Sequence, residues 1–483
     1  MNVQIPFIWV QIRIFNTLAF LLFNGECNAQ QLLYVPIAKI FLPTFIEMKY
    51  NIKNGLLWLF IYTLLALVPM AIALAGDNPP YRTFWIELGV AMGFIGLGTM
   101  SMQMIFSGRI SSVAPVWGMD NVLQFHREIG IIAFLFTLAH PVILLIADPE
   151  YTKYFDPFVN LPRALALSFV SVAIFAIIIT SLWREALKLN YEWWRLIHGV
   201  LGFGIVFVGI THSIQVSHYL DTLWQKIAIG LTMGICAYMV IHTRVVRPWM
   251  NSKKLYKVKD ITLERGEAYT MTIAPDGFKR ASFRSGQFFW MSVGDDVLKM
   301  QQHPFSVSSS DEDPNICFTA KVLGDFTSTW KDIKIGTPVQ LEGPFGSFTL
   351  KGDHPLFMVM GGIGVTPGMS IIRSLIDNKD KRKVILVYAN ETWESITYKD
   401  ELDELNKLPN IEVIYSIAEP PAGWEGESGF LDKEFFEKHL PSNKNQFIYY
   451  ICGPEVVMDI AETSLRELGV GWQQIYSERF QIV

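Results

Sequence analysis

The chain has 483 residues, of which 51% are hydrophobic and 18% are charged, and its net charge is −5. Residues 1–248 hold only 15 of the 40 Lys and Arg and 12 of the 45 Asp and Glu, which excludes a single soluble enzyme. The ordinary composition of the second half excludes a disordered or fibrous chain, and the negative net charge argues against a nucleic-acid partner. The four cysteines are too far apart for an iron–sulfur or disulfide framework, so any redox chemistry must use organic cofactors or histidine-bound metal.

The first 47 residues fit neither half of the chain. Ile5–Phe23 is apolar, but polar residues interrupt it and no clean cleavage site follows, so it predicts an interfacial helix or a seventh membrane span. Met48 stands just before two lysines and the first long apolar stretch, as a natural start would. We therefore expect residues 1–47 to be dispensable or not translated. Loss of membrane insertion in a chain that starts at Met48 would contradict this hypothesis.

Six apolar stretches are long enough to cross a hydrocarbon layer about 30 Å thick, which takes roughly 20 helical residues. They predict a six-helix transmembrane bundle within residues 48–248. Lys and Arg predominate at the ends on one side, whereas Asp and Glu accompany the fewer basic residues on the other side. The positive-inside rule therefore predicts an integral protein of the cytoplasmic or plasma membrane, with everything after Pro248 in the cytoplasm. The six stretches are Gly55–Leu74, Ile86–Phe106, Val122–Ile146, Ala164–Trp183, Trp194–Ile214 and Leu223–Val245.

Two of these stretches carry paired histidines. His126 and His140 lie in the third stretch, and His198 and His212 lie in the fifth, so that each pair is separated by 14 residues. In a helix, 14 residues return to within about 40° of the same face and rise about 21 Å. The third and fifth helices run parallel, so His126 can face His198 while His140 faces His212. This spacing predicts two bis-imidazole metal sites, one near each side of the membrane.

Intramembrane histidines also occur as helix-packing residues or in proton paths. Two matched pairs on parallel helices favour metal ligation over these alternatives, whereas His218 and His242 have no equally spaced partner. Arg127 and Arg195 lie beside the two cytoplasmic ligands. A bis-imidazole site suits a haem iron, and these two arginines can pair with the propionate groups of such a haem, or serve only as positive-inside anchors.

After residue 248 the long apolar stretches give way to shorter segments. Residues 249–352 contain short, partly alternating segments separated by Gly, Asp and Pro, which predict a small antiparallel β-barrel. Residues 353–483 alternate apolar strands, glycine turns and helices, which is typical of a Rossmann-like parallel α/β sheet. The segments of the predicted barrel are Val258–Ile273, Gln287–Val293, Ile316–Val322 and Pro338–Glu342.

Three short motifs of the second half suit cofactors. His303-Pro304-Phe305-Ser306 is a bend with an aromatic ring and a hydroxyl, able to cover a flat heterocycle. Gly361-Gly362-Ile-Gly364-Val-Thr366-Pro367 follows an apolar strand and opens a helix, where free N–H groups can bind a phosphate. Cys452-Gly453-Pro454 also follows a strand directly.

The membrane half resembles the ferric-reductase-like transmembrane domain of the NADPH oxidase and ferric reductase superfamily. The resemblance runs from about Lys49 to the C-terminus. It implies that His126, His140, His198 and His212 hold two b-type haems. In the membrane half it is carried by Arg109, Gly118-Met-Asp, His126-Arg-Glu-Ile-Gly130, His140 and Trp194-Arg-Leu-Ile-His198.

In the second half the resemblance implies roles for the motifs. His303 to Ser306 matches the superfamily's flavin signature, and Gly324-Asp-Phe-Thr327 matches the element that meets the FAD pyrophosphate. The glycine turn is similar to the nicotinamide-dinucleotide loop, with Thr366 near the nicotinamide, and the Cys452 thiol is implied to lie beside the hydride path. Phe480 corresponds to a near-terminal aromatic that stacks on the flavin. Three residues follow Phe480, which departs from the oxidases that end at this aromatic.

The acidic residues Glu391 and Glu419 follow the two strands where relatives carry basic residues for the 2′-phosphate of NADP. They would repel a phosphate and could bind ribose hydroxyls. We therefore expect NADH to serve at least as well as NADPH.

Together these features predict a transmembrane oxidoreductase that moves electrons from cytoplasmic NAD(P)H through FAD and two b-type haems to an acceptor on the far side. Dioxygen, giving superoxide, is the first choice of acceptor. A ferric chelate is a close alternative, and an electron-transfer module that feeds a partner protein is a third. The chain has neither EF-hand loops nor proline-rich docking segments, so no calcium control or cytosolic regulatory subunit is expected.

Overall fold

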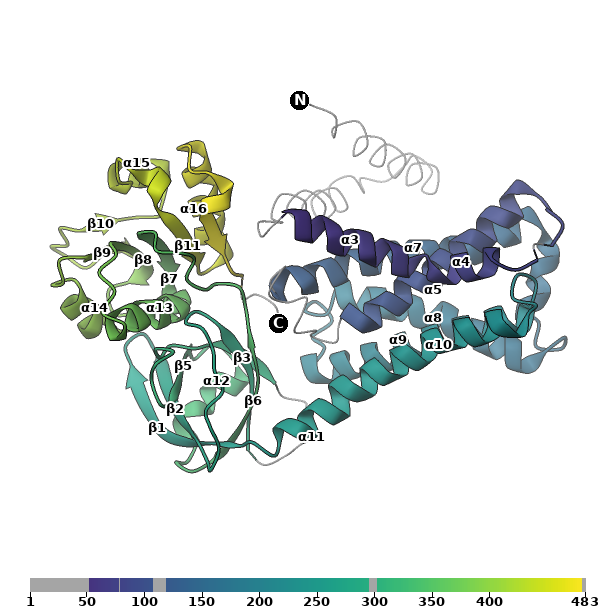
Figure 1. Ribbon diagram of the computed structural model, residues 1–483, viewed down its shortest axis with the longest axis horizontal. Helices are drawn as coiled ribbons and strands as arrows, with labels where there is room; N and C mark the ends of the chain where they lie inside the picture. Colours follow the sequence, from purple (N-terminus) through teal and green to yellow (C-terminus); the bar gives the residue numbers. More distant parts are fainter. Residues whose placement is uncertain (1–51, 78, 107–118, 295–301, 480–483) are drawn as a thin grey trace. The chain divides into compact units, whose positions relative to one another are not determined.

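The computed structural model describes residues 52–77, 79–106, 119–294 and 302–479 (Figure 1). Several features named above lie outside these residues, namely the extension 1–47 with Met48, Arg109, Gly118 and Phe480. The predictions that rest on them stay predictions.

Among the described residues, five helices are long and apolar enough to cross a membrane, and they match the last five predicted spans. The first predicted span is instead a pair of shorter helices that meet at an angle of 45°. Pro69 lies in the first turn of the second helix of this pair, where its ring would clash with the preceding turn of one continuous helix. The count is therefore five, or six if the bent pair crosses as one span. The elements are α3 (Ile52–Ala66), α4 (Val68–Leu74), α5 (Phe84–Phe106), α7 (Met119–Ala147), α8 (Leu161–Leu182), α9 (Tyr191–Val216) and α10 (Leu223–Ile241).

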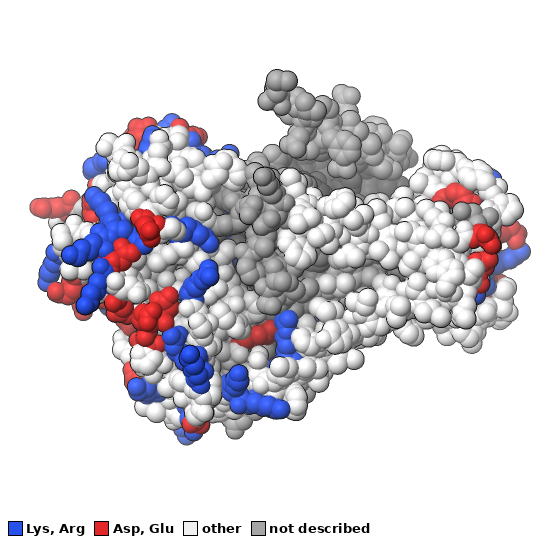
Figure 2. All heavy atoms as spheres, viewed as in Figure 1, with Lys and Arg blue, Asp and Glu red and all other residues white. Residues whose placement is uncertain are grey.

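The last span continues beyond the boundary predicted at residue 248. A π-helical segment, η2 (His242–Val246), follows α10 and leads into the short helix α11 (Arg247–Asn251), so the chain leaves the helix only after Asn251. On the face that Figure 2 shows, charged side chains gather on the second half and at one end of the helices, and the helices between are almost free of them.

The flavin half of the soluble region is one curled antiparallel sheet with the strand order β4-β3-β6-β1-β2-β5. The two edge strands approach each other through a single bridge between Val307 and Phe318 and a hydrogen bond from Ser308 N to Cys317 O of 2.8 Å. Among the described residues, the predicted barrel is therefore a half-barrel whose edge strands meet at this one bridge. Its core buries Met271, Phe318 and Trp330. The strands are β1 (Tyr256–Glu264), β2 (Ala268–Pro275), β3 (Phe288–Val293), β4 (His303–Ser306), β5 (Ile316–Lys321) and β6 (Pro338–Phe345).

The last part is a parallel sheet with the strand order β10-β9-β8-β7-β11-β12, as the alternation of strands and helices predicts. Apolar residues of α13 and α14 pack on one face of this sheet, and those of α15 and α16 pack on the other. The strands are β7 (Leu356–Gly361), β8 (Val384–Thr392), β9 (Ile411–Glu419), β10 (Glu427–Ser428), β11 (Ile448–Cys452) and β12 (Ile475–Ser477). The helices are α13 (Val365–Asp377), α14 (Lys399–Leu405), α15 (Lys433–His439) and α16 (Glu455–Glu467).

Candidate functional site

Helices α7 and α9 bring the four membrane histidines together as two facing pairs. The ring centroids of His126 and His198 are 6.2 Å apart, and those of His140 and His212 are 6.4 Å apart. An imidazole nitrogen binds a transition metal at about 2.0–2.1 Å and lies about 1.1 Å from the ring centre, so two imidazoles on opposite sides of one metal have centroids about 6.3 Å apart. Both pairs therefore have the spacing of a bis-imidazole metal site.

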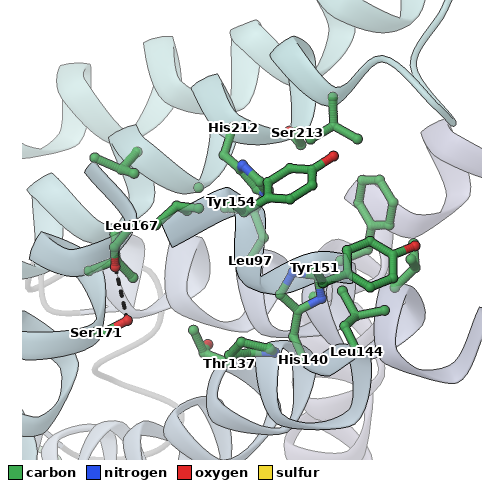
Figure 3. A pocket seen from close by; sticks show the side chains of 18 of the residues that line it. Leu97, Thr137, His140, Leu144, Tyr151, Tyr154, Leu167, Ser171, His212 and Ser213 are labelled. Carbon is green, nitrogen blue, oxygen red and sulfur yellow. Dashed lines mark hydrogen bonds between the residues drawn. The ribbon is translucent and has the colours of Figure 1, made fainter. Parts of the chain in front are cut away.

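A cavity of about 340 Å³ lies between His140 and His212. Its walls are mostly apolar, and Leu97, Leu144 and Leu167 are among the lining residues (Figure 3). Such a mostly apolar slot with two imidazoles suits a flat, apolar macrocycle bound through its iron.

A polar cluster that the sequence reasoning did not assemble lines part of this cavity. Arg82 Nε donates to Glu87 Oε1 at 3.0 Å, and Arg82 Nη1 donates to the hydroxyl of Tyr151 at 3.2 Å. The hydroxyl of Tyr219 also donates to Glu87. Arg163 lies over the ring of Tyr154, 4.3 Å from its centroid. The available signal was the carboxylate of Glu87 within an apolar span, because such residues are costly in a membrane and usually have a role.

The two arginines predicted to meet haem propionates have different surroundings. Arg127 is exposed, whereas Arg195 is half-buried and lies over the ring of Tyr191, 5.6 Å from its centroid. Their role toward propionates stays a prediction.

The flavin motif forms strand β4, which pairs with β3 so that His303 lies opposite Met291 and Ser306 lies opposite Phe288. The ring of His303 stacks on Phe326 with centroids 4.3 Å apart. Phe326 belongs to the short helix α12 (Asp325–Ser328), which contains the second predicted FAD element. The structure therefore places both predicted flavin elements side by side, and burial lowers the pKa of His303, so its ring is neutral near pH 7.

Within the second flavin element, the hydroxyl of Thr327 accepts a hydrogen bond from Gly324 N at 3.2 Å. Pro304 and Phe305 lie in β4 between His303 and Ser306, and the ring of Phe305 packs at 5.0 Å from that of Trp330.

The two predicted nucleotide turns meet at the carboxyl ends of neighbouring strands, where Met360 of β7 pairs with Cys452 of β11. A Cβ atom on Gly364 would lie 2.6 Å from the carbonyl oxygen of Cys452, and one on Gly361 would lie 2.8 Å from Pro454 Cδ. The glycines thus permit a close approach of two backbone segments. Gly362 and Gly453 have positive φ values of 50° and 159°, and Pro367 is buried in the first turn of α13.

Helix α13 connects this turn to the flavin half-barrel through polar side chains. The hydroxyl of Thr366 donates to Ile363 O at 2.8 Å, and the hydroxyl of Ser370 donates to Ser309 O at 2.7 Å. Arg373 donates to Ser308 O at 2.6 Å and holds Glu401 with two further hydrogen bonds of 2.8 and 2.5 Å. These contacts hold the nucleotide turn in a defined position beside the flavin motif.

Arg373 and Glu478 were missed by the sequence reasoning. Glu478 is only 3% exposed, and a Cβ atom on Gly346 would lie 2.9 Å from its Oε1, so its carboxylate lies at the turn after β6. Neither residue belongs to a local motif, so only the tertiary structure identifies it. Phe480, two residues further on, lies outside the described residues.

The two acidic residues predicted to discriminate against NADPH lie at the carboxyl end of the parallel sheet. Glu391 precedes the last residue of β8, Glu419 ends β9, and both are exposed. Thr392 pairs with Glu419, so the two strand ends are adjacent.

Three family models match successive parts of the chain. Residues 92–210 match a ferric reductase like transmembrane component, residues 256–349 match a FAD-binding domain, and residues 358–463 match an oxidoreductase NAD-binding domain. The chain has the NADPH oxidase and ferric reductase architecture. The resemblance stated from the sequence is thereby confirmed at the level of domains.

Single proteins resemble part of this chain. NADH-cytochrome b5 reductase 1 of Dictyostelium discoideum is 32% identical over 36% of this chain and 63% of its own length. The plasma membrane-associated coenzyme Q6 reductase of Saccharomyces cerevisiae is 26% identical over 56% of this chain and 90% of its own length. The chain thus spans less than two thirds of the first of these relatives. Among solved structures, the flavohem-like FAD/NAD binding domain of nitric oxide dioxygenase from Vibrio cholerae is 19% identical, with a TM-score of 0.43 over 47% of this chain and 98% of that domain.

Proposed function

We propose that the protein is a transmembrane oxidoreductase that moves electrons from cytoplasmic NAD(P)H, through FAD and two b-type haems, to an acceptor on the far side of the membrane. The observation that carries the proposal is the pair of facing histidines at each end of α7 and α9, with centroid distances of 6.2 and 6.4 Å. When bound, FAD accepts a hydride as an electron pair and haem iron carries one electron at a time.

The soluble residues hold and orient the dinucleotide and the flavin. The Gly361 to Gly364 turn offers N–H groups at the start of α13, where phosphate binds well. Ser306 presents its hydroxyl at the end of β4, and Cys452 lies at the end of β11 beside the glycine turn. We assign flavin contact to Ser306 and a position beside the hydride path to Cys452. Phe480 is assigned to the flavin, as the near-terminal aromatic that the resemblance implies.

The membrane residues hold two haems and exclude water from them. His126 and His198 form the inner site, and His140 and His212 form the outer site. Because the outer cavity has mainly apolar walls, it keeps water away from the iron. Arg127 and Arg195 are assigned to the propionates of the inner haem.

Dioxygen is the proposed acceptor, and superoxide the product. The apolar lining of the outer cavity, with residues such as Phe94 and Leu145, supports an apolar diatomic molecule as the species that approaches the outer site. The second candidate is a ferric chelate. Arg163, which lies over the ring of Tyr154 in the cavity wall, favours it, because a guanidinium attracts anionic chelates.

One assay separates these acceptors. Full-length protein supplied with FAD, haem and NADH should reduce cytochrome c, and superoxide dismutase should abolish the signal if superoxide is the product. Reduction of ferric citrate that is insensitive to dismutase would favour the chelate. If the protein reduces neither cytochrome c nor ferric citrate without an added partner protein, the proposal of an oxidase is wrong. The remaining hypothesis is then an electron-transfer module that feeds a partner protein.

The haem ligands are tested separately. His140→Ala or His212→Ala should remove one haem and stop electron transfer to the acceptor, while reduction of FAD by NADH continues. His242→Ala is the matched control, because His242 lies after α10, stacked on Tyr238 at 5.5 Å, and faces no paired histidine. Retention of two haems by His140→Ala would show that the ligand assignment is wrong.

A further inference from the structure

The connection between helices α7 and α8 forms part of the wall of the cavity between His140 and His212. Helix α7 ends at Ala147, seven residues after His140, and the 3₁₀ helix η1 (Pro149–Phe155) follows. Because η1 lines the cavity and also joins the ends of two spans, it lies between this histidine pair and the water at that end. Three of its side chains line the cavity, namely those of Tyr151, Tyr154 and Phe155 (Figure 3).

The backbone of η1 has a defined shape. At its start, the carboxylate of Asp148 accepts a hydrogen bond from Glu150 N at 3.0 Å, and the carbonyl of Asp148 accepts one from Tyr151 N at 3.1 Å. The hydroxyl of Thr152 donates to Pro149 O at 2.7 Å. The proline ring also fixes φ at the first position of η1. We therefore treat η1 as one small body that moves as a unit.

Two arginines from neighbouring elements hold the tyrosines of η1. Arg82, just before α5, donates from Nη1 to the hydroxyl of Tyr151 at 3.2 Å. Arg163, in the first turn of α8, lies over the ring of Tyr154 at 4.3 Å from its centroid and donates from Nη2 to Lys153 O at 3.1 Å. Each tyrosine therefore has a charged partner outside η1, which ties η1 to the bundle at two points.

Arg82 is itself held in place by other residues. Its Nε donates to Glu87 Oε1 of α5 at 3.0 Å, and the hydroxyl of Tyr219, between α9 and α10, also donates to Glu87. If η1 moves away from the cavity, the hydrogen bond of Tyr151 breaks while Arg82 stays on Glu87. Loss of the Tyr151 hydroxyl thus loosens η1 and leaves the ion pair of Arg82 intact.

The ring of Tyr154 lies directly beside His212. Their centroids are 6.1 Å apart and their planes meet at 80°, so the edge of one ring faces the other. Aromatic rings are in contact at centroid distances of about 4.5–7 Å, so a ferric chelate has no room between these two rings. A diatomic acceptor does not need that room, because the mostly apolar walls of the cavity let it approach from the hydrocarbon.

We propose that η1 is a cover that selects the electron acceptor by size. With η1 in place the outer site admits dioxygen and excludes bulky acceptors such as ferric chelates, and Tyr151 and Tyr154 determine this specificity. The inference rests on the proposed function. A bulky acceptor reacts only with those molecules in which η1 has moved away, so its rate is proportional to their fraction. Weaker contacts of η1 raise that fraction, and with it the rate for bulky acceptors alone.

The test compares two acceptors on full-length protein loaded with FAD and haem and supplied with NADH. Superoxide is measured in air as dismutase-sensitive reduction of cytochrome c. Ferric citrate is measured under nitrogen, where no superoxide forms, and the rate that persists in His140→Ala is subtracted because it does not pass through the outer site.

Tyr151→Phe removes the hydroxyl that Arg82 holds and keeps the ring and every charge. It should raise the rate with ferric citrate, relative to the rate with dioxygen, about tenfold, the factor that one hydrogen bond to a charged group provides. Tyr154→Leu removes the ring beside His212 and should change the same ratio in the same direction. Glu150→Gln is the matched control, because Glu150 pairs with Lys153 inside η1 and both side chains are mostly exposed. It should leave the ratio unchanged.

The outcomes separate the cover from the proposed function. If wild-type protein forms superoxide and both tyrosine variants keep its ratio of rates, the cover is refuted and the proposed function stands. If wild-type protein already reduces ferric citrate as fast as dioxygen, the cover is refuted together with the preference for dioxygen, and electron transfer through the haems stands. If wild-type protein reduces both acceptors no faster than His140→Ala does, the proposed function is refuted as well.

Discussion

Removal of Arg373 should loosen the two cofactor halves from each other. Its guanidinium makes two hydrogen bonds to Glu401 and one to Ser308 O, which lies just after the flavin strand β4. Burial alone lowers the pKa of Arg373, but the hydrogen bonds to Glu401 raise it above its ordinary value, so the side chain stays charged. We expect Arg373→Met to weaken the connection between α13 and the flavin half-barrel, in which the hydrogen bond from Ser370 to Ser309 O remains.

The expected loss in the free energy of unfolding follows from how far the partners of Arg373 are exposed to solvent. Breaking a fully buried ion pair costs about 3–5 kcal/mol, but the side chain of Glu401 is 37% exposed, so solvent screens part of that loss. An unsatisfied carbonyl such as Ser308 O costs about 1–3 kcal/mol when buried. We expect a loss of about 2–3 kcal/mol in the free energy of unfolding. For a region of this size that lowers Tm by roughly 5–10 °C.

The assay is thermal release of FAD, followed by its fluorescence, on the full chain with FAD bound. Stopped-flow reduction by NADH should also slow by about tenfold or more, because small displacements of reacting groups are costly in rate. Lys407→Met is the control, because the ion pair of Lys407 with Glu404 is mostly exposed and should contribute less than about 1 kcal/mol. Equal Tm values for Arg373→Met and wild type would refute the reasoning.

Three further predictions concern the soluble half. Gly364→Ala should slow reduction of FAD by NADH about tenfold or more at unchanged FAD content, measured by stopped flow, because its Cβ would lie 2.6 Å from the Cys452 carbonyl oxygen. Glu419→Gln should raise the kcat/KM ratio of NADPH to NADH about fivefold, the factor that about 1 kcal/mol of charge repulsion provides. The Glu427 carboxyl accepts a hydrogen bond from Lys438, which lowers its pKa. Its stabilising effect is thus present above the unfolded pKa of about 4.3 and is lost as pH falls through the lowered folded value, so the Tm gap to Glu427→Gln should close in acid.

Each of these has its own control. Gly368→Ala lies on the same helix as the glycine turn, but its nearest neighbours are flexible methionine side chains, so it should reduce FAD at nearly the wild-type rate. Glu412→Gln changes an exposed carboxylate near the other end of β9 and should leave the NADPH preference unchanged. A Tm gap between wild type and Glu427→Gln that does not narrow at all as the pH falls below the unfolded pKa of about 4.3 would contradict the linkage argument.

Periodic features were readable from the sequence, whereas features that depend on tertiary contacts were not. The apolar stretches predicted six spans, of which five are long helices among the described residues, and the 14-residue spacing placed His126 opposite His198 and His140 opposite His212. The strand-turn-helix order predicted the nucleotide turn. Hydropathy could not separate α3 from α4, because Pro69 changes the direction of the chain without changing its apolar character.

The residues that contact the membrane histidines could not be predicted from the sequence, because these contacts also depend on tertiary structure. Gln103, whose side-chain amide lies beside His126, is one polar residue near the end of an apolar span. Gly89 contacts His140 Nδ1 through its carbonyl oxygen at 2.8 Å, and a backbone carbonyl carries no side-chain signal. The half-barrel closes only at one bridge, because its edge strands meet through non-local pairing that strand patterns do not specify.

The distance between the two histidine pairs makes the proposed reaction sensitive to membrane voltage. The 14 residues from His126 to His140 rise about 21 Å, roughly two thirds of a 30 Å hydrocarbon layer. An electron that moves outward between the pairs carries negative charge across most of the electric field. At 100 mV, negative inside, this field favours the outward step by about 1.5 kcal/mol per electron. Turnover would therefore depolarise the membrane, and a current should accompany it unless another carrier returns the charge.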